Sequence, residues 1–167
     1  MKTCYGLAVL GFLLPITPLM LGAQQATVRS AAPVLFVCEH GTVKSLLAKL
    51  LFDEYAAEVG LQMPAVSRGT RADSVVPPWM QARLATDHLA LGSWRPQTLG
   101  PQDLATAALV VSFDVPLAAT ATARAPHARW DGLPSVSTQY ADGRDAIKVR
   151  VRQLVDSLKR ASGPRKF

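Results

Sequence analysis

Residues 33–45 read PVLFVCEHGTVKS, and this stretch decides the fold. Pro33 to Cys38 is a continuous apolar run rich in β-forming residues, and the loop after it contains Gly41. An apolar run of this kind, bounded by proline and glycine, is typical of a strand buried on both faces of a parallel sheet. A helical pattern begins at Ser45, so the stretch predicts a strand, a short loop and a helix in direct succession.

The rest of the chain alternates in the same way. Residues 45–59 place four leucines and Tyr55 on one face at helical spacing, and Gly60 ends that helix. The further elements expected are a strand at 65–67, a helix from Pro77 to about Leu91, strands at 107–113 and 128–130, and a last helix capped by Asp142. This alternation predicts one α/β domain over residues 33–162, with helices on both faces of a four-stranded parallel sheet and a tail at 163–167.

Four side chains of chemical interest each follow a predicted strand: Cys38, Arg68, Asp114 and Asp131. Ligands of open parallel sheets bind beyond the carboxyl ends of the strands, so we expect these residues at one edge. Cys38 also comes just before a helix. A helix N-terminus, a nearby cation and oriented N–H groups all favour the thiolate form of a cysteine. The sequence therefore predicts that Cys38 is reactive, and an inert buried cysteine is the alternative.

The loop Cys38-Glu39-His40-Gly41-Thr42-Val43-Lys44-Ser45 has the composition of an oxyanion cradle. Gly41 can take the left-handed backbone conformation that turns successive N–H groups inward. Such a ring of N–H groups holds three oxygens of a phosphate-like anion. Lys44 adds positive charge, and the Ser45 hydroxyl can donate a hydrogen bond to the thiolate. We expect the side chains of the two residues after Cys38 to point outward.

Composition narrows the classes of partner. The formal net charge of +6 favours anionic ligands but does not indicate nucleic acid. No zinc finger, aromatic RNA-binding box or long basic arm occurs in the 167 residues. Of the two cysteines, Cys4 lies within residues 1–23, which we expect to be removed as a signal peptide. Cys38 would then stand alone without an internal disulfide. A metal site on Cys38 and His40 would lack further ligands, and we predict none.

Residues 1–23 have the features of a secretory signal peptide. Lys2 is followed by an almost wholly apolar stretch at 5–22 that ends in small residues. We expect cleavage after Ala23, a linker at 24–32, and export to the periplasm or the exterior. The alternative is an uncleaved membrane anchor, because the apolar stretch is nearly long enough to span a bilayer. Contact with a membrane is expected in that case alone.

The loop and its surroundings resemble the low-molecular-weight protein tyrosine phosphatases and the related arsenate reductases. Their signature is a cysteine, five residues, an arginine, and a serine or threonine, which Cys38, Lys44 and Ser45 match except for the lysine. The similarity extends to Ser67-Arg68-Gly69-Thr70, Val110-Val111-Ser112-Phe113-Asp114 and Trp130-Asp131-Gly132-Leu133-Pro134. It covers roughly residues 33 to 160 and implies the three-layer α/β/α fold of phosphotyrosine protein phosphatase I.

The resemblance also implies a function. Cys38 would attack a phosphomonoester, best an aryl phosphate, and form a phosphocysteine without metal or organic cofactor. Lys44, Ser45 and the general acid Asp131 would complete the catalytic set, with Asp114 as the alternative acid. The substrate would be bound by Glu39, His40, Gly41, Thr42 and Val43 of the loop, together with Arg68 as a replacement for the missing arginine. The expected partner is a phosphorylated substrate or a free oxyanion.

Three departures from the family pattern keep other functions open. Lys44 is a flexible point charge where an arginine would grip two oxygens. The family usually has Asp-Pro in the later loop, and the nearest sequence here reads Leu133-Pro134-Ser135. Both favour a catalytically weak or inactive oxyanion-binding module. Val43 stands where many members have a second cysteine, so arsenate reduction would need an external thiol.

Overall fold

The computed structural model describes residues 31–117 and 125–162. The predicted signal peptide at 1–23, most of the linker and the predicted tail at 163–167 lie outside these residues. Among the described residues, no helix combines the length and the apolar character needed to cross a membrane.

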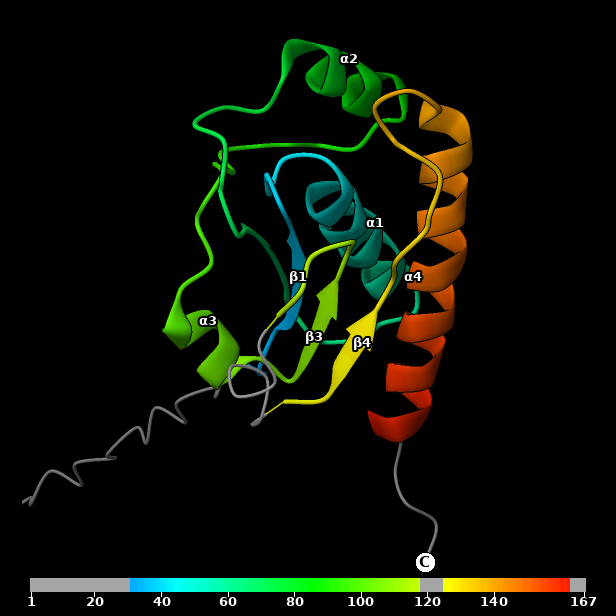
Figure 1. Ribbon diagram of the computed structural model, residues 1–167. Helices are drawn as coiled ribbons and strands as arrows, with labels where there is room; N and C mark the ends of the chain where they lie inside the picture. Colours follow the sequence, from blue (N-terminus) through cyan, green and yellow to red (C-terminus); the bar gives the residue numbers. More distant parts are fainter. Residues whose placement is uncertain (1–30, 118–124, 163–167) are drawn as a thin grey trace, which may run out of the picture.

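Four parallel strands form the sheet, in the order β2-β1-β3-β4 (Figure 1). Their bounds are Val34–Cys38 for β1, Ala65–Gly69 for β2, Leu109–Ser112 for β3 and His127–Arg129 for β4. All five residues of β1 are buried, because β1 lies inside the sheet between β2 and β3. This confirms the strand expected from the apolar run. Cys38 pairs with Gly69 at the carboxyl end of the sheet.

Helices cover both faces of the sheet, as predicted. The side chains of α1 (Lys44–Glu58), α2 (Pro78–Thr86) and α4 (Tyr140–Ser162) share one core, whereas α3 (Pro101–Thr106) packs with a smaller cluster on the other face. The larger core centres on Phe36 of β1, whose ring lies 5.9 Å from that of Phe52 and 6.0 Å from that of Trp130. The result is the expected three-layer α/β/α arrangement.

Several element bounds differ from the prediction. Helix α2 ends at Thr86 instead of continuing to about Leu91. His88 adopts a left-handed backbone with φ of 59°, which turns the chain away from the helix axis. Helix α4 begins at Tyr140, so Asp142 lies in its first turn and is not its cap.

The six-residue helix α3 was not expected. Its start is stabilised by Asp103, whose carboxylate accepts a hydrogen bond of 2.8 Å from the Gly100 N–H. Strand β2 continues to Gly69, two residues past its predicted end. Strand β4 ends at Arg129, one residue before its predicted end.

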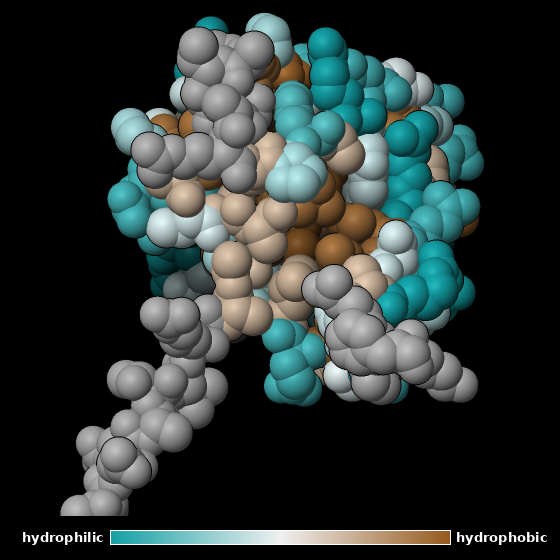
Figure 2. Space-filling view, turned by 90° about the horizontal axis from the view of Figure 1, so that it is seen from below, coloured by the Kyte–Doolittle hydropathy of each residue, from teal (hydrophilic) through white to brown (hydrophobic). Residues whose placement is uncertain are grey.

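The strands all point toward one end of the molecule, where the loop after Cys38 lies (Figure 1). At the opposite end, apolar side chains gather among polar ones (Figure 2). The chemistry that the sequence predicts is therefore placed at the carboxyl ends of the strands.

Candidate active site

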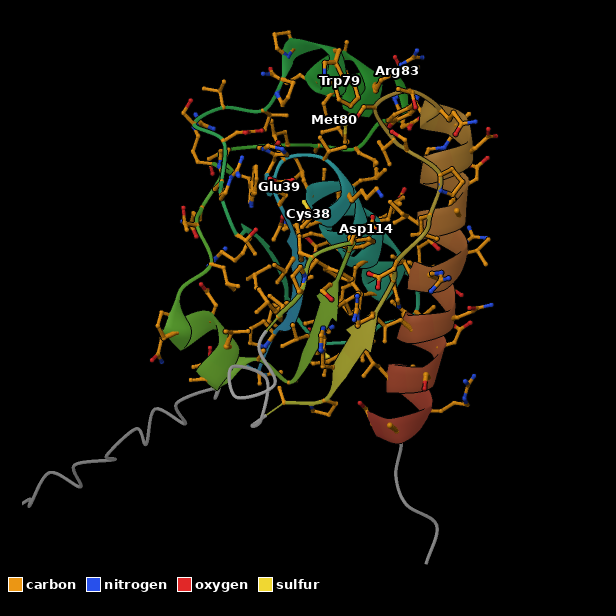
Figure 3. All side chains as sticks on the ribbon, in the orientation of Figure 1. Cys38, Glu39, Trp79, Met80, Arg83 and Asp114 are labelled. Atoms are coloured by element: carbon orange, nitrogen blue, oxygen red, sulfur yellow. The ribbon has the colours of Figure 1, made fainter. Side chains whose placement is uncertain are left out.

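Cys38 is the last residue of β1, and Lys44 is the first residue of α1, so residues 39–43 form a tight connection. The thiol lies at the base of this loop, and the Cys38 residue is 6% exposed. Its Sγ lies 3.0 Å from the Ser45 Oγ and accepts a hydrogen bond of 3.2 Å from the Gly41 N–H. Contacts of this kind stabilise a thiolate. The structure thus brings Cys38 and Ser45 into contact. Figure 3 shows Cys38 beside Glu39 at the end of β1.

The carbonyl groups of the first four loop residues, Cys38 to Gly41, bond to one neighbouring segment, residues 67–73, which we call the bracing segment. The carbonyls of Cys38, Glu39 and His40 accept hydrogen bonds of 2.8–3.1 Å from the N–H groups of Thr70, Arg71 and Asp73. The carbonyl of Gly41 lies 3.0 Å from the Ser67 hydroxyl. In a trans peptide the N–H points away from the preceding carbonyl, so the N–H groups of residues 39–42 face away from the bracing segment. This geometry suits an oxyanion cradle.

Two glycines allow the loop and the bracing segment to approach each other. Gly41 has a left-handed φ of 72°, and a Cβ at this position would lie 2.7 Å from the Gly69 nitrogen. A Cβ at Gly69 would lie 2.8 Å from the carbonyl carbon of His40. Since both contacts are with backbone atoms, neither position can hold a side chain without moving the loop.

The Cys38 thiol belongs to a buried hydrogen-bond network with the hydroxyl groups of Ser45 and Ser67. Ser67 Oγ lies 2.9 Å from Ser45 Oγ, and Ser45 Oγ in turn contacts the Cys38 sulfur. Both serines are fully buried. Because this network is shielded from water, its hydrogen bonds hold the Ser45 hydroxyl beside the sulfur.

Lys44 is paired with Asp114 across the edge of the sheet. The ammonium Nζ donates to the Asp114 Oδ2 at 2.5 Å. Asp114 follows β3 and adopts a left-handed φ of 52°. Burial raises the pKa of the Asp114 carboxyl, but hydrogen bonds from Lys44 and from the Gly132 N–H, with the lysine charge, outweigh it and hold the pKa below its usual value. Asp114 therefore favours the charged form.

Each of the two candidate acids, Asp114 and Asp131, accepts a hydrogen bond from a backbone N–H of the loop that carries the other. The Asp114 N–H donates to the Asp131 Oδ1, and the Gly132 N–H donates to the Asp114 Oδ1, both at 2.9 Å. The second oxygen of Asp131 pairs with Arg129 at 2.6 Å. The structure thus brings both carboxylates close to Lys44, beyond the carboxyl ends of β3 and β4. Both carboxylates already accept hydrogen bonds.

Arg68 does not reach the loop with its guanidinium group. Its Nε donates to Asp103 of α3 at 2.9 Å, and its Nη1 donates to the Ser67 carbonyl. These contacts point the group toward the α3 face, because alternate residues of a strand face opposite sides of the sheet. The prediction that Arg68 replaces the missing arginine is therefore not supported by this arrangement.

Glu39 and His40 point outward, as expected, with about half of each side chain exposed. Thr42, by contrast, is fully buried. Its hydroxyl donates to Asp73 at 2.6 Å. Asp73 is a site residue that the sequence did not reveal, because nothing in its local pattern marks it and its contacts lie 31 and 33 positions back in the chain. The described residues hold no cluster of three or more metal-ligating side chains.

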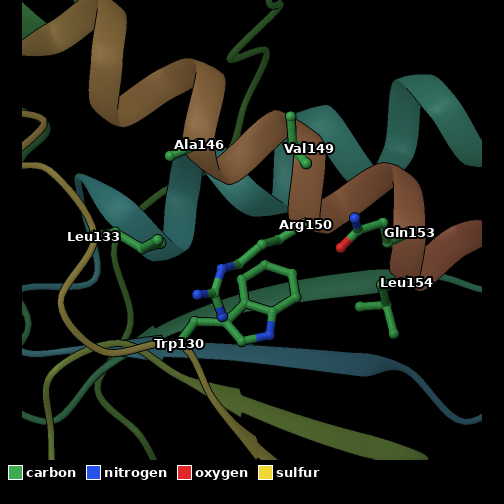
Figure 4. A pocket seen from close by; sticks show the side chains of 7 residues that line it. All are labelled: Trp130, Leu133, Ala146, Val149, Arg150, Gln153 and Leu154. Carbon is green, nitrogen blue, oxygen red and sulfur yellow. The ribbon is translucent and has the colours of Figure 1, made fainter.

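A cavity of about 650 Å³ lies elsewhere, between α4 and the residues that follow β4 (Figure 4). It is lined by Trp130, Leu133, Ala146, Val149, Arg150, Gln153 and Leu154. The Arg150 guanidinium carbon lies 5.9 Å from the centre of the Trp130 ring. No residue of the Cys38 loop lines this cavity.

The same fold occurs in solved structures of several enzymes. A thioredoxin-dependent arsenate reductase from Corynebacterium glutamicum aligns with a TM-score of 0.65 and 22% identity, covering 81% of this chain and 66% of that one. A low molecular weight protein tyrosine phosphatase from Bacillus subtilis has a TM-score of 0.62 and 24% identity, covering 77% and 97%. An arginine phosphatase from Geobacillus stearothermophilus has a TM-score of 0.62 and 15% identity, covering 78% and 94%. At these identities the likeness shows the fold alone.

The family model of the low molecular weight phosphotyrosine protein phosphatases matches residues 33–129, which is more than half of the chain. The search of curated proteins found no match to this chain. The matched region runs from the start of β1 to the end of β4, and so includes the Cys38 loop and Asp114. The chain therefore belongs to the low molecular weight phosphotyrosine protein phosphatase family, whose members are enzymes.

Proposed function

We propose that this protein hydrolyses phosphomonoesters through a phosphocysteine on Cys38. The observation that carries the proposal is the Cys38 sulfur at the base of the loop, within 3.0 Å of the Ser45 hydroxyl and 3.2 Å of the Gly41 N–H. The thiolate attacks phosphorus, the bond to the ester oxygen breaks, and an aspartic acid protonates that oxygen. Water then attacks the phosphocysteine, the P–S bond breaks, and phosphate leaves as the thiolate is restored.

The loop stabilises the charge that spreads over the phosphoryl oxygens in the transition state. The N–H groups from Glu39 to Val43 are the proposed donors, and Lys44 adds a positive charge. Arginine would grip two oxygens in a fixed geometry, which a lysine cannot do. Losing one such donor costs about 10²–10³ in rate, so we expect slow turnover.

Asp131 is the proposed general acid, with Asp114 as the alternative. Both stand beyond the carboxyl ends of β3 and β4, near the pair formed with Lys44. Asp131 has one oxygen on Arg129 and one on the Asp114 N–H. To donate a proton, Asp131 must first be protonated, which removes the negative charge that pairs it with Arg129.

A burst assay with an aryl phosphate tests the proposal. The parent protein should release aryl alcohol, Cys38→Ser should release none, and Lys44→Arg should release it faster. Lys49→Arg is the matched control, since Lys49 lies on the same helix and also pairs with a carboxylate, Asp53. No release from the parent at high enzyme concentration would contradict a hydrolase.

A second candidate is an oxyanion-binding module with little or no turnover. The observation that favours it is the Lys44–Asp114 pair, which neutralises the cation of the cradle. Measurable phosphate binding without aryl alcohol release would support this function. Arsenate-dependent consumption of an external thiol would instead identify an arsenate reductase.

We also propose that the protein is exported, on the basis of residues 1–23 alone. Sequencing the N-terminus of the protein purified from its host tests this. A chain that begins near Gln24 indicates a cleaved signal peptide. A chain that keeps residues 5–22 and stays with the membrane fraction indicates an anchor.

A further inference from the structure

Asp73 connects the bracing segment to the middle of the oxyanion loop by side chain and by backbone. One carboxylate oxygen accepts a hydrogen bond of 2.6 Å from the Thr42 hydroxyl. The other lies 3.0 Å from the His40 Nδ1. The Asp73 N–H donates to the His40 carbonyl at 3.1 Å. A single residue thus holds the loop on both sides of Gly41.

This connection supplies what the loop lacks by itself. Gly41 has a left-handed backbone, a conformation that glycine can leave at little cost. Thr42 is fully buried, and without Asp73 its hydroxyl would lose the partner that it has in the structure. The two side-chain contacts of Asp73 therefore fix the residues on either side of the most adaptable point of the loop.

We propose that Asp73 is a positioning residue that keeps the loop N–H groups directed at the bound oxyanion. It acts through Thr42 and His40 and does not itself touch the anion. The inference depends on the proposed cradle, but it needs binding alone and not turnover. It gives the buried hydroxyl of Thr42 and the outward imidazole of His40 a shared role in the site.

The direction of the change in anion affinity on removing Asp73 separates a positioning role from a simple charge effect. A carboxylate beside an anion site repels the anion, so its removal should strengthen anion binding if charge alone mattered. Loss of the positioning contacts should weaken binding instead. The sign of the change on removing Asp73 therefore distinguishes the two.

Calorimetric titration of the full chain with inorganic phosphate is the test. Asp73→Ala should weaken phosphate binding by about tenfold or more, an order expected for loss of hydrogen bonds to a charged group. Asp73→Asn should recover at least the parent affinity, because an amide can serve both Thr42 and His40 without the negative charge. Asp53→Ala is the control, since it removes a similarly exposed carboxylate from the C-terminal half of α1.

Thr42 provides a second route that does not depend on the folding of Asp73→Ala. Thr42→Val should lower phosphate affinity in the same direction, and Thr42→Ser should restore most of what is lost. The double variant Asp73→Ala with Thr42→Val should lose less than the two single losses combined.

Phosphate affinity that rises in Asp73→Ala, or that is unchanged in Thr42→Val, would overturn the positioning role. A parent that binds phosphate without hydrolysing an aryl phosphate would overturn the hydrolase and leave this inference standing. If the parent hydrolyses the ester, kcat/KM should fall in Asp73→Ala in parallel with phosphate affinity. A parent that binds no phosphate would overturn the cradle and this inference with it.

Discussion

Lys44 and Asp114 form an ion pair of 2.5 Å that joins the first turn of α1 to the loop after β3. The lysine side chain is 20% exposed and the aspartate side chain 43%. The cation that the loop offers to an oxyanion is therefore already engaged, and an incoming anion must compete with Asp114 for it. The strength of this pair should control how tightly the cradle binds.

Asp114→Asn should tighten phosphate binding by roughly three- to tenfold, because it leaves Lys44 free to approach the anion. The pair of Lys49 with Asp53 is a close match, with side chains 19% and 41% exposed. Asp53→Asn should therefore leave phosphate affinity unchanged. Calorimetric titration measures both variants. Weaker binding in Asp114→Asn would mean that Asp114 orients Lys44 and does not compete with the anion.

Ser45→Ala should slow the alkylation of Cys38 by iodoacetamide at neutral pH by roughly ten- to a hundredfold, as expected on losing a hydrogen bond to a charged group. Turnover of an aryl phosphate should fall with it. Ser112→Ala is the control, because Ser112 is also fully buried but bonds to His127 instead of Cys38. Mass spectrometry of the Cys38 peptide gives the rate. Equal rates in Ser45→Ala and the parent would remove the serine from the mechanism.

Gly41→Ala should lower the free energy of unfolding by more than about 3 kcal/mol, since it combines a left-handed backbone with a backbone clash against Gly69. Gly92→Ala isolates the first effect. Gly92 has a φ of 54° with no atom within 4 Å of an added Cβ, so its variant should lose only roughly 1–2 kcal/mol. Urea unfolding of both variants provides the comparison. Similar losses would show that the approach to Gly69 does not matter.

The stabilisation that Tyr140 provides should be lost in alkaline solution. Its hydroxyl donates to Asp87 at 2.6 Å, and burial, with this hydrogen bond and the charge of Asp87, raises the pKa of the phenol far above 10.0. A raised pKa means that the native state holds the proton more tightly than the unfolded chain does. The stabilisation is complete below pH 10 and is lost as the pH rises toward the native pKa.

Tyr140→Phe removes this ionisation. Its free energy of unfolding should be lower than that of the parent at neutral pH, and the difference should shrink above pH 10. Urea unfolding at several pH values measures the difference. A gap that stays constant between pH 8 and pH 11 would contradict the assignment.

The parts of the site that lie close together in the sequence could be predicted. Cys38, Gly41 and Ser45 fall within eight positions, and strand, loop and helix signals all bear on them. The pairing of Lys44 with Asp114 spans 70 positions, and that of Thr42 with Asp73 spans 31. No local pattern encodes such contacts, since they depend on which strands become neighbours.

The order and type of the main helices and strands could be predicted more fully than the short peripheral helix α3 and its contacts. Burial on both faces made the strand at β1 visible in composition alone. Helix α3 has six residues and none of them is buried, so it shows no apolar periodicity. The same long-range dependence misled the assignment of Arg68, because its partner Asp103 belongs to that unexpected helix.

The bracing segment has a consequence for the order of folding. A fragment ending at Gly60 would contain every residue of the oxyanion loop. It would hold none of the groups that bind the carbonyls of residues 38–41, because those groups begin at Ser67. During synthesis on a ribosome, the loop would therefore not adopt its native conformation until β2 had emerged and paired with β1. Grafting the eight loop residues onto another strand and helix would fail for the same reason, unless a bracing segment were transplanted with them.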